Sequence, residues 1–281
     1  MNRIRVLTLN IWNNSGPWAE RVDLIREELC RLDPDIFGLQ EVLRLAPESP
    51  SERAPGSESD QALKIAAGLN YEIAYGPATR YGQGLTLGNA LLSRFPIVEE
   101  RNFSLPGEET GETRALLHAL VKTPSGLLPV FVTHLNWKLH HGSVRLEQVR
   151  FIADRILEVP VADDSRLPAV LMGDFNAEPD SDEIRFLRGL HTLDKRSVFF
   201  ADAWIYGHGG GSGYTFDRKN CFAALAHEAP RRIDYIFVHG PDGQHRGEPL
   251  RTTLAFQSAA RRDGEDIWPS DHFGVFTELS V

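Results

Sequence analysis

Apolar side chains recur along the chain with two different spacings, and each spacing predicts a type of element. A spacing near 3.6 residues predicts helices over 18–32, 61–69 and 143–157. Alternation and short apolar runs, bounded by glycine and proline, predict strands. In chain order the predicted strands are 3–9, 35–41, 71–75, 88–93, 97–104, 114–122, 128–134, 168–173, 232–239, 250–256 and 273–279.

The order of these elements predicts one domain over residues 1–281. Strands and helices do not alternate strictly, which disfavours a Rossmann fold, and two sheets packed face to face with helices outside fit the order better. The range 44–60 has three prolines and many serines and predicts a flexible loop, and the glycine-rich range 207–213 predicts a mobile one. We expect Ser143 to cap its helix and Cys30 to belong to the core.

Composition and charge exclude several classes of protein. Hydrophobic residues make up 42% of the chain and charged residues 25%, as in folded proteins, and no apolar run reaches the roughly 18 residues of a membrane span. Lys plus Arg total 30 and Asp plus Glu total 39, so the net charge of −9 disfavours a protein that coats nucleic acid. The net charge does not exclude a nuclease that carries bound cations.

The two cysteines offer no disulfide framework, which favours a reducing compartment. We therefore expect a cytoplasmic protein, with secretion after removal of a leader left open. We also expect a monomer.

Polar side chains gather where the predicted strands end or begin. Singly, each has an ordinary structural explanation, because an aspartate after a strand is commonly a turn former. Together they supply oxygen ligands and proton-transfer groups that suit Mg²⁺, Mn²⁺ or Ca²⁺ better than a structural zinc ion. The set contains Asn10, Gln40, Glu41, His134, Asn136, Asp174, Asn176, Asp234, Asp271 and His272. The chain has no GxSxG and no GxxxxGK[ST], so serine acyl transfer and P-loop chemistry have no support.

The motifs that carry these residues resemble one family. In chain order they are Thr8-Leu9-Asn10-Ile11-Trp12, Gly38-Leu39-Gln40-Glu41-Val42, Gly88-Asn89-Ala90-Leu91-Leu92-Ser93-Arg94, Val132-Thr133-His134-Leu135-Asn136, Met172-Gly173-Asp174-Phe175-Asn176, Arg232-Ile233-Asp234-Tyr235-Ile236 and Ser270-Asp271-His272. This series resembles the endonuclease/exonuclease/phosphatase superfamily, which includes deoxyribonuclease-I-like nucleases, apurinic endonucleases, neutral sphingomyelinases and inositol polyphosphate 5-phosphatases. The resemblance implies an α/β (α+β) fold, a four-layered sandwich of two mixed β-sheets flanked by helices.

The resemblance also implies roles in the hydrolysis of a phosphodiester. Glu41 is expected to bind a metal ion with Asn10 and Asp271 beside it, and this metal would polarise a phosphoryl oxygen. Asp174 is expected to orient or deprotonate the attacking water. Asn176 would hold that water or the phosphate.

Two histidines complete the implied machinery. His272 is expected on the phosphate, with Asp234 fixing its tautomer and favouring its cationic form. His134 resembles the second histidine of the family, which contacts phosphate or assists the leaving group.

Other residues have weaker assignments. Asn136 resembles an amide that contacts phosphate, and Asn89 either orients the site or shapes a turn. Arg114 pairs either with a core carboxylate or with phosphate. The pairs Arg231-Arg232 and Arg261-Arg262 either hold phosphate or are solvated.

The predicted function is a divalent-metal-dependent phosphodiester hydrolase that uses Mg²⁺ or Mn²⁺, with Ca²⁺ as a further choice. The acidic charge and the lack of a basic stripe with interleaved aromatics disfavour long nucleic acids. The range 213–238 resembles sphingomyelinase-like members, and Trp12, Trp18 and Trp137 would suit an apolar or choline-like group at the mouth. A lipid head group or another small phosphodiester is therefore the favoured substrate. A DNA or RNA nuclease is the alternative, and a phosphomonoesterase or a catalytically silent scaffold is less favoured.

Overall fold

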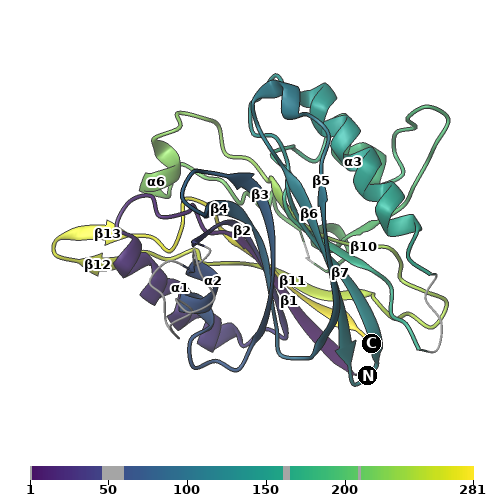
Figure 1. Cartoon of the computed structure of the whole chain (residues 1–281), viewed down its shortest axis with the longest axis horizontal. Helices are drawn as coiled ribbons and strands as arrows, with labels where there is room; N and C mark the ends of the chain where they lie inside the picture. The colour runs from purple at the N-terminus through teal and green to yellow at the C-terminus, as the bar shows by residue number, and fades with distance from the viewer. Residues whose placement is uncertain (1, 46–59, 161–164, 208–209) are drawn as a thin grey trace.

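The computed structural model describes residues 2–45, 60–160, 165–207 and 210–281, and in them two six-stranded sheets stand face to face (Figure 1). The first sheet has the strand order β11 (Pro249–Ala255), β14 (Gly274–Ser280), β1 (Arg3–Asn10), β2 (Ile36–Leu45), β4 (Leu85–Ser93), β3 (Glu72–Arg80). The second has the order β5 (Ile97–Ser104), β6 (Ala115–Thr123), β7 (Gly126–His134), β8 (Val170–Asp174), β10 (Asp234–Val238), β9 (Ala201–Asp202). A separate hairpin pairs β12 (Ala260–Arg262) with β13 (Glu265–Ile267).

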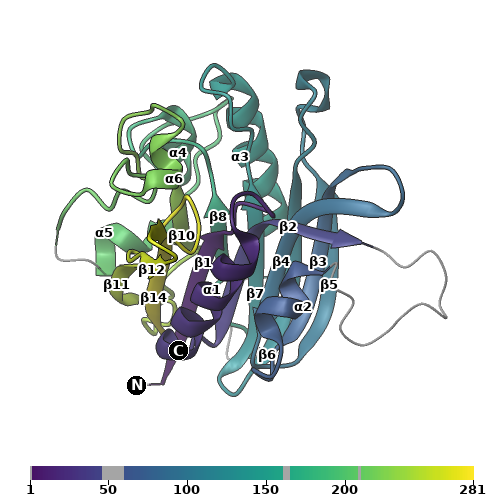
Figure 2. The ribbon, with the colours of Figure 1, turned by 90° about the vertical axis from the view of Figure 1, so that its left-hand side faces the viewer.

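The helices are α1 (Trp18–Leu32), α2 (Gln61–Ala66), α3 (Gly142–Leu157), α4 (Asp182–Leu187), α5 (Ala203–Gly207) and α6 (Cys221–Ala224), together with the 3₁₀ turn η2 (Glu108–Thr110). Helices α1 and α2 pack on the outer face of the first sheet, and α3 and α4 pack on the outer face of the second. Helix α5 instead contacts strands of both sheets, and α6 packs against Phe216 and Ile233. Figure 2 shows α1 and α2 in front of the first sheet, and α3 lies outside the second. The predicted four-layered sandwich of two mixed sheets is confirmed.

Alternation along each strand explains these layers. In β1, Val6 faces the apolar layer between the two sheets, whereas Leu7 and Leu9 face α1 and α2. In β7, Val130 faces the layer between the sheets and Phe131 faces α3. Because successive side chains of a strand point to opposite faces, a strand buried on both sides reads as a continuous apolar run.

Each sheet contains a parallel pair of strands joined by a helix. β1 and β2 are parallel and connected through α1, and β7 and β8 are parallel and connected through α3. Helix α1 ends where Asp33 adopts φ +47° and donates its N–H to the Leu29 carbonyl, just before Pro34. The carboxyl ends of parallel strands meet at one edge of a sheet, which is where ligands bind in open α/β sheets.

The strand predictions are confirmed, and the differences concern ends and short elements. β2 extends to Leu45 and β3 to Arg80, each beyond the predicted end. The pattern of apolar residues did not predict elements that are too short to show a helical or strand periodicity, namely α4, α5, α6, β9, β12 and β13. Most of the predicted loop 44–60, and part of 207–213, lies outside the described residues.

Two local predictions were wrong. Ser143 does not cap α3, because the helix already begins at Gly142 and the cap position is His141 without a side-chain hydrogen bond. Cys30 is exposed, since it lies one residue past Leu29 on the outer side of α1, and Cys221 is exposed as well. Among the described residues, no helix is long and apolar enough to cross a membrane.

Candidate active site

The layer between the sheets is apolar along most of its length and turns polar at one edge. In β7, Val130 and Val132 lie in this layer, and His134 follows in the same phase. In β8, Met172 lies in it and Asp174 follows. The same phase in β1 leads from Val6 through Thr8 to Asn10, and in β10 from Ile236 back to Asp234. The polar side chains therefore extend the face that elsewhere forms the inner core.

Glu41 joins this set through a β-bulge. Between Leu39 and Val42, three steps along β2 face two steps along β4, from Ala90 to Gly88. Glu41 takes φ +58° within the bulge, a left-handed conformation that a non-glycine residue adopts only when its surroundings impose it. Bulges re-aim side chains beside active sites, and this one turns Glu41 toward Asn10.

Two motif glycines permit the close approach of backbones around the site. A Cβ on Gly38 would lie 2.6 Å from Met172 Sδ of the opposing sheet. Gly173 has φ +143°, and a Cβ there would lie 1.9 Å from the Thr133 carbonyl oxygen. The contact at Gly173 is with backbone and leaves no room for a side chain, so this glycine permits the close approach of β7 and β8, whereas at Gly38 the Met172 side chain would have to move.

A pocket of about 340 Å³ opens at this edge. Of the residues predicted for the site, those that line it are Asn10, Glu41, Arg114, His134, Asp174, Asn176, Asp271 and His272. Aromatic side chains contribute as well, with Trp12, Trp137 and Phe216 in the wall. Trp18 instead packs on the outer face of the first sheet.

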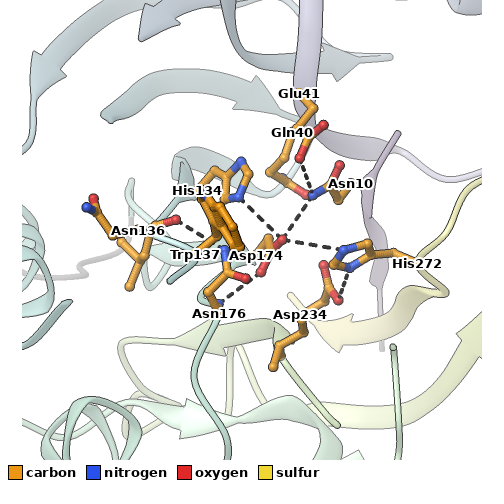
Figure 3. A network of polar contacts seen from close by, with 12 residues as sticks. Asn10, Gln40, Glu41, His134, Asn136, Trp137, Asp174, Asn176, Asp234 and His272 are labelled. Atoms are coloured by element: carbon orange, nitrogen blue, oxygen red, sulfur yellow. Dashed lines mark hydrogen bonds and ion pairs between the residues drawn. The ribbon is translucent and has the colours of Figure 1, made fainter. Parts of the chain in front are cut away.

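Asp174 lies at the centre of the polar network (Figure 3). Its Oδ2 accepts a hydrogen bond from Asn10 Nδ2 at 2.9 Å, and its Oδ1 accepts one from the Asn176 backbone N–H at 2.9 Å. The Nε2 atoms of His134 and His272 approach Oδ2 to 3.5 and 3.7 Å. Burial, and next the charge of Asp234, raise the pKa of Asp174 to about 7. A carboxylate with that pKa can take a proton near neutral pH.

His272 is paired with a carboxylate. Its Nδ1 lies 2.8 Å from Asp234 Oδ2, and both side chains are buried. Burial alone would lower the pKa of His272, but the charges of Asp234, Asp271 and Asp174 outweigh it and raise this pKa well above its usual value. Asp234 itself is held by its backbone N–H, which donates to Thr215 Oγ1 at 3.1 Å. His272 is thus a buried imidazolium.

His134 has a different partner. Its Nδ1 lies 3.2 Å from Arg114 Nη1, and Arg114 Nη2 donates to Glu112 Oε2 at 3.1 Å. Burial lowers the pKa of His134 well below its usual value, and the charges of Arg114 and His272 act in the same direction. Of the two alternatives for Arg114, the structure shows a carboxylate pair, with Glu112, at the pocket wall.

Glu41 and Asp271 form an acidic wall of the pocket. Glu41 accepts hydrogen bonds from Asn10 Nδ2 at 3.2 Å and Asn13 Nδ2 at 2.7 Å, and Asp271 accepts one from Ser270 Oγ at 3.2 Å. The side chains that donate these hydrogen bonds are all uncharged. Burial raises the pKa of Asp271 to about 6, and the nearby charge of Glu41 adds to this increase. Two carboxylates that repel each other while contacting only neutral donors are suited to holding a cation between them.

A second acidic group is less suited to a metal ion. Potential ligand atoms of Asp174, Asp234 and His272 lie within 4.8 Å of one another. However, His272 already uses Nδ1 to bind Asp234, and the raised pKa keeps its ring positively charged. An imidazolium has no free lone pair and repels a cation, so the carboxylates of Glu41 and Asp271 are the better candidates for metal ligands.

Three residues predicted for the site, Asp234, Asn136 and Asn89, are not among the described residues that line the pocket. Asp234 still reaches the site through His272, whereas Asn136 and Asn89 lie elsewhere. Asn136 is buried, and its side chain bonds Thr110 Oγ1 at 2.9 Å and Gln148 Nε2 at 2.7 Å. Figure 3 shows it turned away from Asp174. Asn89 donates to the Ala115 carbonyl at 2.9 Å and thereby joins β4 to the other sheet, so it shapes no turn.

Several residues of the site were not predicted from the sequence. Asn13 holds Glu41, and Glu112 holds Arg114, yet neither stands at a strand end. For Arg231 and Arg232, where contact with phosphate and solvation were both left open, the structure places Arg231 at the pocket beside Glu228 and buries Arg232 against Asp202 at 2.9 Å. Charged residues in loops next to a motif were the available signal, but sequence alone does not show which of them turn inward.

Comparison with known proteins gives a match over most of the chain. A family model described as the Endonuclease/Exonuclease/phosphatase family matches residues 7–272. Protein angel of Drosophila melanogaster is 30% identical in an alignment of 192 residues that covers 61% of this chain and 47% of that protein. The match therefore spans about half the length of that relative.

Solved structures with similar folds cover the whole chain. An endonuclease/exonuclease/phosphatase from Beutenbergia cavernae has a TM-score of 0.70 at 25% identity, covering 100% of this chain and 72% of that one. D. rerio TDP2 complexed with a single-strand DNA product has a TM-score of 0.74 at 21% identity, with 100% of both chains covered. At 21% identity, the similarity to D. rerio TDP2 shows that the two proteins share a fold.

Proposed function

This chain belongs to the endonuclease/exonuclease/phosphatase family, and we propose that it is a divalent-metal-dependent phosphodiesterase. The observation that carries the proposal is the composition of one pocket. A buried carboxylate with a pKa of about 7, a buried imidazolium and a pair of acidic metal-ligand candidates all reach it. These are the groups that hydrolysis of a phosphoric ester requires.

The acidic wall fits Mg²⁺ or Mn²⁺. Glu41 and Asp271 supply carboxylate oxygens, and Asn10 Oδ1, which accepts the Trp12 N–H at 2.9 Å, keeps a second lone pair for a ligand role. Hard oxygen donors of this kind prefer these ions over zinc. When bound, the metal would polarise a phosphoryl oxygen and offset its negative charge.

The protein side chains supply the remaining chemistry. Asp174 takes the proton of the attacking water while the new P–O bond forms, and Asn176, whose side chain is anchored to the Leu135 carbonyl at 3.1 Å, borders that position. His272 stabilises the charge on the phosphoryl oxygens. The opposite P–O bond breaks, the leaving oxygen takes a proton from a solvent water to become an alcohol, and Asp174 returns to solvent the proton that it took.

The charge of the pocket favours a compact substrate with a single phosphodiester. Its lining includes four acids, Glu41, Asp174, Asp271 and Glu228, and two arginines, Arg114 and Arg231. Such a lining offers little to the extended backbone of a nucleic acid. A lipid head group or another small phosphodiester remains the favoured substrate.

A nucleic-acid substrate is the second candidate, and two observations favour it. The fold matches that of TDP2 in complex with a single-strand DNA product. Trp12 and Trp137 in the pocket wall could stack on a base, which is how single strands are bound without a sequence preference.

Two chromogenic esters test the reaction type. We expect bis-p-nitrophenyl phosphate to be hydrolysed faster than p-nitrophenyl phosphate with Mn²⁺ or Mg²⁺, and EDTA to abolish both activities. Preference for the monoester would indicate a phosphatase, and no metal-dependent hydrolysis would refute the proposal. A panel of sphingomyelin, soluble phosphodiesters, plasmid DNA and RNA under one metal condition then separates the two substrate classes.

The variant Glu41→Gln tests the metal assignment. An amide is a poorer Mg²⁺ ligand than a carboxylate, so the metal concentration for half-maximal activity should rise by at least tenfold. Glu183→Gln is the control for the same change of side chain elsewhere, because Glu183 is a buried glutamate that pairs with Arg145 outside the pocket. An unchanged metal dependence in Glu41→Gln would contradict the assignment.

A further inference from the structure

The ring of His134 contacts the guanidinium of Arg114, and this contact is compatible with only one protonation state of the ring. Arg114 Nη1 lies 3.2 Å from His134 Nδ1. A guanidinium carries only N–H donors, so Nδ1 must be the acceptor in this contact. The single ring proton then sits on Nε2. An imidazolium would instead turn a second N–H toward the guanidinium.

The surroundings of the ring favour the same state. His134 is buried, and the charged groups that face it are Arg114, Asp174 and His272. Two of these three are cations. The remaining one, Asp174, faces Nε2 at 3.5 Å, where an Nε2–H can point toward its carboxylate.

Glu112 holds Arg114 in place. Its Oε2 accepts hydrogen bonds from Arg114 Nη2 and from the Trp137 backbone N–H, each at 3.1 Å. Its Oε1 lies 3.5 Å from His141 Nδ1. Glu112 and Arg114 immediately precede β6, which runs antiparallel to β7, so the start of one strand lies beside the His134 end of the other. The pair is therefore part of the sheet edge and not a solvated surface contact.

We propose that Arg114, anchored by Glu112, is a positioning residue that fixes His134 as the neutral tautomer with its proton on Nε2. His134 then serves the reaction as a hydrogen-bond donor to a phosphoryl oxygen and not as a cationic acid. That role rests on the proposed phosphodiesterase function, whereas the tautomer rests on the Arg114 contact alone. Neutral histidines kept in this state act as electrophiles in other enzymes.

Nitrogen-proton correlation spectra of the histidine rings test the tautomer directly. In the metal-free protein we expect His134 to show a protonated Nε2 and an unprotonated Nδ1 from pH 8 down to pH 5.5, with His134→Gln identifying the signals. An imidazolium at pH 6, or a proton on Nδ1, would overturn the proposal. This measurement uses the wild-type protein and does not depend on how any variant folds.

Variants test whether Arg114 is the cause. Arg114→Met should let His134 titrate at a pKa at least one unit higher and populate both tautomers, and Arg114→Lys should restore much of the wild-type spectrum. Arg145→Met is the matched control, because Arg145 also pairs with a glutamate, has a side chain that is 7% exposed against 11% for Arg114, and supports the loop after His134 through the Lys138 carbonyl at 2.8 Å. Equal effects of Arg114→Met and Arg145→Met on His134 would show that loop packing, and not the Arg114 contact, sets the tautomer.

Activity measurements separate this proposal from the proposed function. With Mn²⁺ and bis-p-nitrophenyl phosphate, Arg114→Met should move the acid limb of the kcat profile to higher pH, and Arg114→Lys should move it back. If the spectra show the expected tautomer but no ester is hydrolysed, the function is wrong and the tautomer stands. If hydrolysis occurs and His134 is cationic, the tautomer is wrong and the function stands.

Discussion

Two histidines face the same carboxylate from opposite sides, and their surroundings favour a neutral ring for His134 and a cationic ring for His272. The Nε2 atoms of His134 and His272 lie 3.5 and 3.7 Å from Asp174 Oδ2, and both residues are buried. The difference lies at Nδ1, which contacts Arg114 in one ring and Asp234 in the other. Burial acts on both rings in the same direction, so the difference between their pKa values comes from the charged groups around them, with Arg114 beside His134 and Asp234 foremost beside His272.

The two pairs also differ in where they stand. Arg114 and His134 come from neighbouring strand ends of one sheet, at the start of β6 and the end of β7. His272 precedes β14 of the first sheet, whereas Asp234 begins β10 of the second. The cationic histidine thus joins the two sheets, and its geometry depends on how they pack.

Removing the cationic histidine should have the largest effect. We expect His272→Ala to lower kcat on a phosphodiester by about 10³-fold or more, because general acid–base and charge-stabilising groups contribute on that scale. Calorimetric titration should show that Mn²⁺ still binds. A loss of only a few-fold would mean that His272 is not part of the reaction.

Replacing Asp234, the partner of His272, should give His272 the neutral ring that we expect for His134. An amide at position 234 can donate its N–H to Nδ1 of His272, as Arg114 does to His134, and this leaves the ring neutral. Asp234→Asn should therefore lower the pKa of His272 in the ring spectra and reduce kcat by about 10²-fold. A cationic His272 in this variant would show that Asp271 and Asp174 suffice to hold its charge.

The opposite pKa shifts predict opposite dependences of stability on pH in the metal-free protein. The raised pKa of His272 stabilises the fold fully below about pH 6.5, and this contribution is lost as the pH rises toward the folded value. The lowered pKa of His134 has no effect on the free energy of unfolding above about pH 6.5. As the pH falls below that value, the unfolded chain binds a proton that the buried ring does not, and the free energy of unfolding decreases. Each effect is at most about 1.4 kcal/mol per pH unit.

Urea unfolding between pH 5 and pH 9 in EDTA measures both dependences. His134→Gln should flatten the loss of unfolding free energy on the acid side, and His272→Gln should flatten the loss on the alkaline side. If both variants flatten the same side, the two rings do not differ in charge.

The smallest effect is expected at the pocket mouth on the His134 side. Trp137 is 55% exposed and lines the pocket, so Trp137→Ala should raise KM a few-fold for substrates with an aromatic or apolar group and leave kcat nearly unchanged. Tyr206→Ala is the control, because Tyr206 is 54% exposed but lies on α5, away from the lining residues. Equal changes in the two variants would mean that Trp137 does not contact the substrate.

Much of the site could be predicted because strands impose an alternation on the sequence. His134, Asp174 and Asp234 share the phase of the valines and isoleucines before or after them, so the pattern already places them on the inner face. Parallel strand pairs then bring Asn10 beside Gln40 in the first sheet and His134 beside Asp174 in the second. The glycines of the motifs indicate where the backbones must approach closely.

The positions of some side chains do not follow from the alternation along a strand, and these positions were predicted less well. Glu41 enters the pocket through a bulge, which shifts the phase of β2 by one residue. Asn136 follows a strand end as closely as Asn176 does, yet its side chain is fully used by Thr110 and Gln148. Asn89 lies in a recognised motif but connects the two sheets.

The sequence by itself determined the two-sheet architecture, the family and the residues at the polar edge, because apolar periodicity and motif order are local properties of the chain. The tertiary structure alone decided which partner each histidine meets, since Arg114 and Asp234 are brought to the rings by strand register and by the packing of one sheet on the other. The charge of an imidazole depends on distances of a few ångströms between residues that lie 20 to 38 positions apart. No local pattern encodes such distances.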